Sequence, residues 1–370
     1  MRIALVYDRV NKFGGAERIL QTLHEIWPEA PLFTAVYDPA GAVWSQIFHV
    51  KASFLKYIPF LQTKHEFLSL LTPLAFESFD LRKFDVVISI SSAEAKSVIT
   101  SHSTMHVCYC LTPTRYLWSG YFDYLQQPGI GKLNAIARVI MKTAFTSLRK
   151  WDYIASLRPD YYIAISKNVQ KRIKSYYKRD SVIIYPPLNL LNHKKSSIRD
   201  NDYFLIVARL VPYKKIDYAI QVFNELGWNL KIIGNGIDEF RLKHMSNSNI
   251  EFIDSNLTDQ ELGCYYQNCR GLIFPGEEDF GLTAVEAQFY GKPVLALASG
   301  GALETVVKGK TGDFYEEASV DGLKSALLRF HPEEYQEVDC IKNAKKFDKN
   351  KFKSEMKKTI VLLWNKYQQI

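Results

Sequence analysis

Strand-like apolar runs alternate with helix-like segments from the first residues of this chain onward, and this alternation constrains the fold most. The runs IALVYD (residues 3–8), FDVVISIS (84–91) and HVCYCLTP (106–113) are strand-like, whereas AERILQTLHEIW (16–27) is helix-like. An order of this kind is typical of a parallel sheet covered by helices. The sequence therefore predicts an α/β fold.

The alternation occurs in two series, which indicates two domains. A polar, turn-rich stretch at residues 189–202 follows the first series and is interpreted as a linker. The second series contains the strand-like runs YFLIVARL, NLKIIGNG, IEFID, GLIFPG and KPVLALA. We predict two Rossmann-like, doubly wound parallel-sheet domains over residues 1–195 and 196–346, followed by a C-terminal helix at 347–370. Ligands should bind outside the carboxyl ends of the strands.

Composition narrows the class of protein and the compartment. The start MRIALVYDRV reads as a buried strand and lacks the features of a signal peptide. No run approaches the roughly 18 to 20 apolar residues that cross a bilayer. We therefore expect a cytoplasmic protein. Its net charge of +8 indicates attraction to nucleic acid, anionic lipid or a phosphate-bearing substrate, without choosing among them.

The cysteines predict neither a metal site nor a disulfide framework. Their number is five, which is odd, and their spacings match neither a zinc site nor a thioredoxin-like CxxC. We expect reduced cysteines that mostly pack, no metal and no cofactor.

The segment PGEEDFGLTAVEAQFYGKPVLALASGG carries the sharpest functional signal. It reads as a loop, a short helix, a glycine stop, a strand and a second glycine loop. If the helix begins near Leu282, Glu286 lies about one turn inside it and Glu278 lies in the loop before it. The backbone N–H groups of Gly281, Leu282 and Thr283 would then face an anion, since a helix N-terminus favours negative charge.

Two further loops of the second domain carry suitable groups. Arg209 and Lys214 follow the strand YFLIVARL, five positions apart, and Gly234 and Asn235 follow the strand NLKII. An arginine and a lysine can share one diphosphate and stabilise the charge that grows on a leaving group. We therefore predict a metal-independent diphosphate site.

These residues resemble the retaining glycosyltransferases of family 4. The likeness is carried by GGAER in the first loop, ARLVPYKK, IIGNG and EEDFGLTAVEA, which matches the E-x7-E pattern of that family. The resemblance implies the GT-B fold, with an acceptor-side first domain facing a nucleotide-sugar-binding second domain across a cleft. It also implies that the C-terminal helix crosses back to the first domain and provides a hinge for closure.

The family's site residues are carried over onto matching positions. Arg209, Lys214 and Glu278 would be catalytic, with the two cations on the donor diphosphate and Glu278 on the donor sugar. Glu286 would bind the ribose, the backbone near Phe252 would lie by the base, and Gly14 and Gly15 would close over the phosphate. The donor-binding set is Gly14, Gly15, Arg209, Lys214, Gly234, Asn235, Phe252, Glu278, Phe280, Gly281, Leu282, Thr283 and Glu286.

The chain departs from the related branch at Leu111, where relatives often have a histidine that contacts the transferred sugar. Leucine cannot donate a hydrogen bond. His106 is no substitute, because five residues along a strand span roughly 16 Å. Either the enzyme manages without that contact, or its specificity or activity has changed. In the family the leaving phosphate itself takes the acceptor proton, so positioning and electrostatics dominate.

Other interpretations of single motifs are weaker. GGAE lacks the G-x-G-x-x-G pattern and the acidic ribose partner of an NAD site. Paired carboxylates would suit glycoside hydrolysis only if both flanked one bond. Asp8, at the end of the first strand, is interpreted as a structural turn residue rather than a base.

Basic and aromatic residues mix in two segments, residues 51–73 and 131–153. Such a mixture suits an anionic bilayer surface, and an ordinary amphipathic helix is the alternative. No nucleic-acid-binding motif accompanies it. We therefore expect a protein peripheral on the inner face of the cell membrane.

The resemblance implies transfer of a hexose from a nucleotide diphosphate sugar to a lipid-linked oligosaccharide acceptor of surface-polysaccharide assembly. GDP-mannose is the preferred donor, and the alternative is rhamnose or another hexose from a UDP, dTDP or GDP donor. A noncatalytic nucleotide-sugar-binding module and a nucleotide-sugar epimerase stay open as other classes. The acceptor, the linkage and the oligomeric state do not follow from the sequence.

Overall fold

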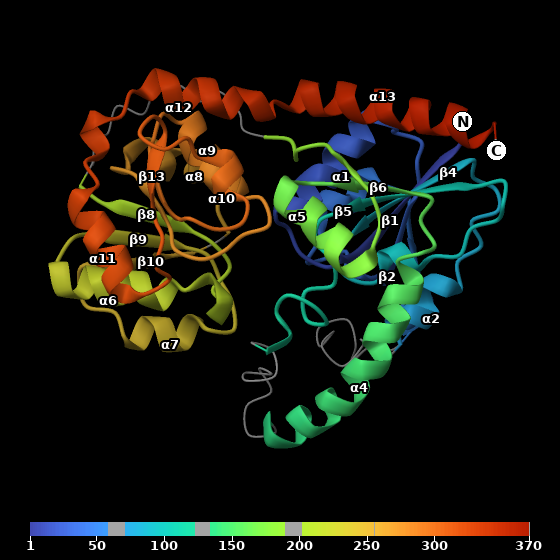
Figure 1. Ribbon diagram of the computed structural model, residues 1–370, viewed down its shortest axis with the longest axis horizontal. Helices are drawn as coiled ribbons and strands as arrows, with labels where there is room; N and C mark the ends of the chain where they lie inside the picture. Colours follow the sequence, from blue (N-terminus) through green and yellow to red (C-terminus); the bar gives the residue numbers. More distant parts are fainter. Residues whose placement is uncertain (58–70, 123–133, 189–201, 255, 370) are drawn as a thin grey trace. The chain divides into compact units, whose positions relative to one another are not determined.

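A computed structural model describes residues 1–57, 71–122, 134–188, 202–254 and 256–369. The chain divides into two compact units, each built on its own sheet (Figure 1). Unit 1 consists of residues 1–187 and 350–370, and unit 2 of residues 188–349.

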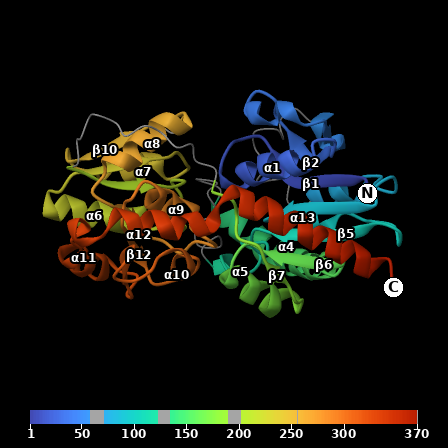
Figure 2. The same ribbon diagram turned by 90° about the horizontal axis from the view of Figure 1, so that it is seen from above.

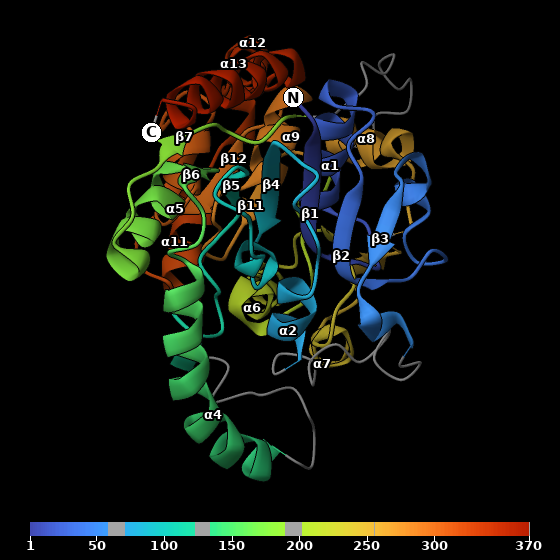
Figure 3. The same ribbon diagram turned by 90° about the vertical axis from the view of Figure 1, so that its right-hand side faces the viewer.

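Unit 1 is built on a seven-stranded parallel sheet in the order β3-β2-β1-β4-β5-β6-β7. Figure 3 shows β4, β1, β2 and β3 side by side. The central strands are the apolar runs of the sequence, and both of their faces are buried, as parallel strands require. The strands are β1 (Ile3–Val10), β2 (Leu32–Tyr37), β3 (Val50–Ala52), β4 (Val86–Ser91), β5 (Met105–Cys110), β6 (Tyr161–Ala164) and β7 (Val182–Ile183).

Helices cover this sheet. Helix α1 buries Ile19, Leu20 and Leu23, which share one face of the helix, and α2 contributes Ala75 and Phe76 to the core beneath β1 and β2. Helix α4 extends away from the sheet (Figures 1 and 3). The α-helices that the structure describes in unit 1 are α1 (Gly15–Ile26), α2 (Thr72–Glu77), α4 (Asn134–Ala155), α5 (Lys167–Arg172) and, from its second residue on, α13 (Lys349–Tyr367).

The long helix α13, near the C-terminus, belongs to unit 1 although residues 188–349 before it form unit 2. It runs along unit 1 (Figures 1 and 2). Its buried face holds Phe352, Met356, Ile360 and Leu363, and the ring of Phe352 meets that of Tyr109 in β5 edge to face. The i, i+4, i+8 and i+11 spacing of these residues explains why one face is buried.

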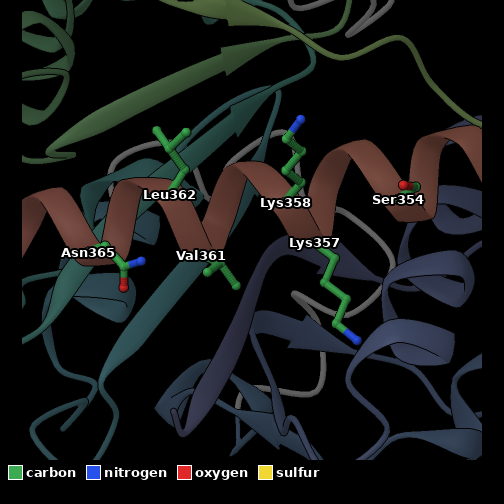
Figure 4. Close-up of a pocket in the computed structure, with 6 residues that line it drawn as sticks. All are labelled: Ser354, Lys357, Lys358, Val361, Leu362 and Asn365. Carbon is green, nitrogen blue, oxygen red and sulfur yellow. The ribbon is translucent and has the colours of Figure 1, made fainter.

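The opposite face of α13 carries lysines beside two exposed aliphatic residues. Figure 4 shows the pocket of about 550 Å³ on this face, which is lined by Ser354, Lys357, Lys358, Val361, Leu362 and Asn365. Within the described residues, no helix has the length and apolar character that a membrane span needs.

Unit 2 is built on a six-stranded parallel sheet in the order β10-β9-β8-β11-β12-β13. Alternate residues of β8 enter two different cores, because successive side chains of a strand point to opposite faces: Phe204 and Ile206 enter one and Leu205 enters the other. The strands are β8 (Phe204–Val207), β9 (Leu230–Ile233), β10 (Ile250–Ile253), β11 (Leu272–Phe274), β12 (Val294–Leu297) and β13 (Gly312–Tyr315).

Seven α-helices are described on the two faces of this sheet. Their bounds are α6 (Ile216–Leu226), α7 (Glu239–His244), α8 (Asp259–Asn268), α9 (Leu282–Phe289), α10 (Ala302–Thr305), α11 (Val320–Arg329) and α12 (Glu337–Ala344). Both sheets reverse their strand order beside the first strand, next to β1 in unit 1 and next to β8 in unit 2. Doubly wound sheets bind ligands at the carboxyl end of such a switch point.

Candidate functional site

Four loops gather at the carboxyl edge of the unit 2 sheet, one after each of β8, β9, β11 and β12. Their backbones bond to one another: Leu210 N–H donates to Asn235 O at 2.8 Å, and Gly301 N–H donates to Glu278 O at 2.8 Å. The sequence-predicted residues of unit 2 lie mainly in these loops and in the helix that follows β11. Phe252 lies in β10 instead.

Glycines make this close approach possible. A Cβ added at Gly234, whose φ is +152°, would lie 1.9 Å from the carbonyl oxygen of Ala208 in the neighbouring loop. A Cβ at Gly276 would lie 2.6 to 2.8 Å from backbone atoms of Lys214. Real Cβ atoms do not approach backbone atoms so closely, so larger residues would push these loops apart.

Lys214 and Glu278 form an ion pair across two of these loops. Lys214 ends a 3-10 turn (Pro212–Lys214), is 7% exposed and lies 5.1 Å above the ring of Tyr213. Glu278 follows β11 and is more exposed than its partner. The structure therefore brings together two of the three residues that the resemblance marks as catalytic.

Arg209, the third of these residues, lies in the same post-β8 loop. Its Nη2 donates to the hydroxyl of Tyr213 at 3.0 Å. Because Lys214 also contacts Tyr213, through the ring, this tyrosine links the two cations. No direct contact between Arg209 and Glu278 is recorded within the described residues.

Helix α9 begins at Leu282, the residue from which the sequence argument starts it. Gly281 precedes it with φ +90°, a conformation that favours glycine. The first intrahelical bonds run from the N–H groups of Ala284 and Val285 to Gly281 O, so those of Leu282 and Thr283 precede them. This geometry suits an anion at the helix start.

Phe280 contributes differently from what its place in the donor-binding set suggests. Its side chain is 4% exposed, and its ring meets that of Phe347 at a centroid distance of 5.3 Å, edge to face. The ring therefore stabilises the core of unit 2. Any contact with a ligand in the loop would come from its backbone.

Glu286 lies inside α9, about one turn from the start, and is 5% exposed. Its Oε2 accepts a hydrogen bond of 2.7 Å from the hydroxyl of Tyr266, a fully buried residue of α8. Tyr266 was not among the sequence-predicted residues.

Phe252 is half-buried in β10, with the ammonium of Lys243 5.7 Å from its ring centroid.

In unit 1, Gly14 is the N-cap of α1 and Gly15 is the first residue of that helix. Glu17 of the same GGAER motif is buried and accepts a hydrogen bond of 2.5 Å from Tyr7. Burial and the Glu17 carboxylate raise the pKa of Tyr7 well above its ordinary value, so its hydroxyl keeps the proton. The motif thus anchors the first turn of α1 to β1.

A second cluster at the carboxyl edge of unit 1 was missed by the sequence argument. Arg9 Nη2 donates to Glu94 at 3.3 Å, and the hydroxyl of Tyr116 donates to Glu94 at 2.6 Å. Burial is the main reason that the pKa of Glu94 is raised. Both residues come shortly after predicted strands, so their place at the carboxyl edge could have been predicted. Their contact with each other, across 85 residues, could not.

Asp8 lies within β1, not at a turn at the strand's end, and its carboxylate bonds to the loop after β4. Its two carboxylate oxygens accept hydrogen bonds from the N–H groups of Ser92, Ala93 and Ala95 and from the hydroxyl of Ser92, at 2.7 to 3.1 Å. Such a fully occupied carboxylate fixes the loop after β4.

Leu111 follows β5 and donates its N–H to Ser91 O at 2.8 Å. His106 is fully buried in β5, where its Nε2 lies 2.9 Å from the hydroxyl of Ser89. Burial lowers the pKa of His106 to about 3, with Arg158 and Arg179 adding to the effect. His106 is therefore a neutral core residue of unit 1.

Among the described residues, no three His, Cys, Asp or Glu side chains group as a metal site. The membrane-surface segments 51–73 and 131–153 lie partly outside the described residues. The 189–202 linker lies almost wholly outside them.

Most of unit 2 matches a known protein family. Residues 190–347 match the family described as "Glycosyl transferases group 1". An uncharacterized glycosyltransferase of Methanocaldococcus jannaschii is 29% identical over 61% of this chain and 64% of its own length.

Two relatives with described roles match shorter stretches. The capsular polysaccharide biosynthesis glycosyltransferase CapM of Staphylococcus aureus is 31% identical over 42% of this chain and 44% of its own length. The alpha-1,3/1,6-mannosyltransferase ALG2 of Dictyostelium discoideum is 30% identical over 34% of this chain and 36% of its own length. The chain thus spans less than two thirds of these relatives.

Solved structures match almost the whole chain in fold. HepE of Anabaena, in complex with UDP-glucose, superimposes with a TM-score of 0.72 at 16% identity, over 98% of this chain and 100% of that one. The sucrose-phosphate synthase of Thermosynechococcus elongatus gives a TM-score of 0.74 at 14% identity, over 99% of this chain and 100% of that one. At this identity the likeness concerns the fold alone.

Proposed function

We propose that this chain, which has the GT-B fold predicted from its sequence, is a glycosyltransferase that takes a hexose from a nucleoside diphosphate donor. The observation that carries the proposal is the Lys214–Glu278 ion pair at the carboxyl edge of unit 2. The pair lies within the stretch that matches the group 1 glycosyl transferases. A cation for the diphosphate and a carboxylate for sugar hydroxyls are thereby held side by side.

In the proposed reaction, the diphosphate lies between the two cations and the start of α9. Arg209 and Lys214 stabilise the negative charge that develops on the leaving diphosphate, and the N–H groups at Leu282 and Thr283 add to it. Glu278 binds sugar hydroxyls and Glu286 binds the ribose. The donor-binding assignment of Gly14 and Gly15 rests on the GGAER motif alone.

The bond changes balance without a further reactant. The acceptor hydroxyl oxygen forms a bond to the anomeric carbon as the bond from that carbon to the diphosphate oxygen breaks. The leaving diphosphate takes the acceptor proton, and the new glycoside keeps the anomeric configuration of the donor. In this proposal the protein's cations do the work of a metal ion.

GDP-mannose stays the preferred donor, because an alpha-1,3/1,6-mannosyltransferase is among the relatives. The alternative is rhamnose or another hexose on UDP, dTDP or GDP, and the UDP-glucose in HepE favours keeping UDP in the panel. We propose a lipid-linked oligosaccharide acceptor and a cytoplasmic protein on the inner membrane face. The kinship with a capsular polysaccharide enzyme and the net charge of +8 support this.

A thermal-shift panel of GDP, UDP, dTDP, ADP and NAD tests the proposal. A ligand at about 100 times its dissociation constant adds about 2.7 kcal/mol, which raises the melting temperature by a few degrees. One nucleoside diphosphate should stabilise the chain, and Arg209→Ala should abolish the shift. Arg329→Ala, an exposed arginine at the end of α11, is the matched control and should leave it intact. Stabilisation by NAD alone would sink the proposal.

Leu111 keeps one further candidate in view, a noncatalytic nucleotide-sugar-binding module. Such a module would pass the thermal-shift test and yet release no nucleoside diphosphate from any donor. Measurement of donor turnover separates the two.

A further inference from the structure

A buried tyrosine of α8 touches the carboxylate that we assign to the donor ribose. The hydroxyl of Tyr266 donates to Glu286 Oε2 at 2.7 Å, although the two residues are 20 positions apart and come from different helices. Tyr266 is fully buried and Glu286 nearly so. A hydroxyl–carboxylate bond shielded from water is stronger than one at the surface.

Packing fixes the direction of this hydroxyl. The ring of Tyr266 stacks on that of Tyr290 at a centroid distance of 5.7 Å and an interplanar angle of 12°. The surrounding core includes Phe274, Ala284 and Ala287, so the strand before the donor loop and the helix after it both hold the ring. Side chains in such a close-packed core occupy rotamer minima with little room to move.

The helix that carries Tyr266 is itself anchored at its start. Thr258 and Glu261 form a capping box, in which Thr258 Oγ1 accepts from Glu261 N–H and the Glu261 carboxylate accepts from Thr258 N–H. These reciprocal bonds satisfy the backbone N–H groups of Thr258 and Glu261 and define where α8 begins. The hydroxyl of Tyr266 is thus placed by a fixed helix and a packed ring.

We infer that Tyr266 is a positioning residue for nucleotide recognition, which acts by holding the carboxylate of Glu286 toward the ribose hydroxyls. This inference rests on the proposed function. A carboxylate has about four acceptor sites, so one carboxylate can accept from both the Tyr266 hydroxyl and a ribose hydroxyl. Tyr266 sets the orientation of Glu286 without touching the ligand itself.

The test compares binding of a nucleoside diphosphate with that of its 2′,3′-dideoxy analogue, using GDP or UDP, whichever the chain binds more tightly. Wild type should prefer the ribonucleotide. Tyr266→Phe should lower ribonucleotide affinity about tenfold and leave the affinity for the dideoxy analogue nearly unchanged, because only the ribose contact is lost. The ratio of the two dissociation constants should approach one.

Tyr203→Phe is the matched control. Tyr203 lies in the same core, and its hydroxyl donates to the backbone oxygen of Tyr265 at 2.9 Å. This variant removes one tyrosine hydroxyl from that core without touching Glu286, so it should keep the wild-type ratio. A general loss of packing would move both variants equally.

A double-mutant cycle keeps the test decisive if Tyr266→Phe lowers stability. In a Glu286→Gln background, Tyr266→Phe should change the ratio no further, because it acts through the carboxylate. Full ribose discrimination in Tyr266→Phe overturns the inference, and equal wild-type affinity for both nucleotides overturns the ribose assignment beneath it. A chain that binds neither nucleotide overturns the proposed function and the inference with it.

Discussion

The carboxyl edges of the two sheets are built by opposite means. In unit 1, buried charges hold the loops: Lys96 Nζ lies 2.6 Å from Asp152 Oδ1, and both residues are fully buried. In unit 2, glycines let the loops meet backbone to backbone, and the charges at the edge differ in exposure: Arg209 and Glu278 are more exposed, whereas Lys214 is 7% exposed.

This difference suggests different roles for the charges of the two units: those of unit 1 hold the fold together, whereas those of unit 2 are the ones that we propose bind the donor. Asp152 of α4 accepts hydrogen bonds from Lys96, Thr114, Trp118 and Tyr177, which tie the loops after β4 and β5 to two helices. Charges that are fully used inside the protein are unavailable to a ligand. In unit 2, Arg209 is exposed and Lys214 pairs with the partly exposed Glu278, so we propose that a diphosphate can reach both cations.

The largest expected effect is on the buried charge of unit 1. Asp152→Ala removes the acceptor of four donors and leaves Lys96 buried without its counter-ion, which should lower the free energy of unfolding of unit 1 by about 3–5 kcal/mol. Denaturant titration followed by tryptophan fluorescence measures this, because five of the six tryptophans lie in unit 1.

Asp80→Ala is the control for that prediction. Asp80 is an exposed carboxylate of unit 1 paired with Arg82, so its loss should lower the free energy of unfolding far less than the loss of Asp152. Equal effects of the two substitutions would contradict the claim that buried charges hold the loops of unit 1.

A smaller effect is expected at the glycine contact of unit 2. Gly276→Ala places a Cβ against the backbone of Lys214, which should cost about 1–3 kcal/mol and shift Lys214 away from Glu278. Nucleotide affinity should therefore fall together with stability. Gly227→Ala, where a Cβ meets nothing within 4 Å but φ is +69°, should destabilise the unit and keep nucleotide affinity.

The smallest expected effect depends on pH. The folded pKa of His106 is about 3, below its unfolded value of about 6.5, so only the unfolded chain takes up a proton between these values. Stability is complete well above pH 6.5 and falls as the pH drops, by on the order of 1 kcal/mol at pH 5.5.

His106→Gln isolates the contribution of this histidine to the pH dependence. The difference in unfolding free energy between wild type and variant should change with pH only below about 6.5. The histidines of unit 2 in the described residues, His244 and His331, are exposed, so unit 1 should be the acid-sensitive unit. A pH-independent difference would contradict the account.

Local patterns predicted the fold well, because apolar strand runs and glycine stops act over a few residues. The sequence argument started α9 at Leu282 and put Glu286 inside it, and the helix confirms both. Contacts between distant residues could not be predicted. Lys214 meets Glu278 across 64 positions, and Tyr266 meets Glu286 only because α8 and α9 pack together.

Burial also changed what single residues contribute. Phe280 belongs to a motif that is read as a ligand loop, yet its ring packs on Phe347. Phe252, which we propose lies by the donor base, is half-buried in β10 and carries no distinctive signal in the sequence.

The most direct test of the central claim is donor hydrolysis followed by proton NMR in the presence of EDTA, with water standing in for the acceptor hydroxyl. GDP-mannose and UDP-glucose are each incubated with wild type, Lys214→Ala and Arg329→Ala. The account predicts release of nucleoside diphosphate and of a sugar that first appears in the donor's anomeric configuration, lost only in Lys214→Ala. Release that needs a divalent metal, inverts the anomeric configuration, proceeds equally in Lys214→Ala or never occurs with any donor would contradict it.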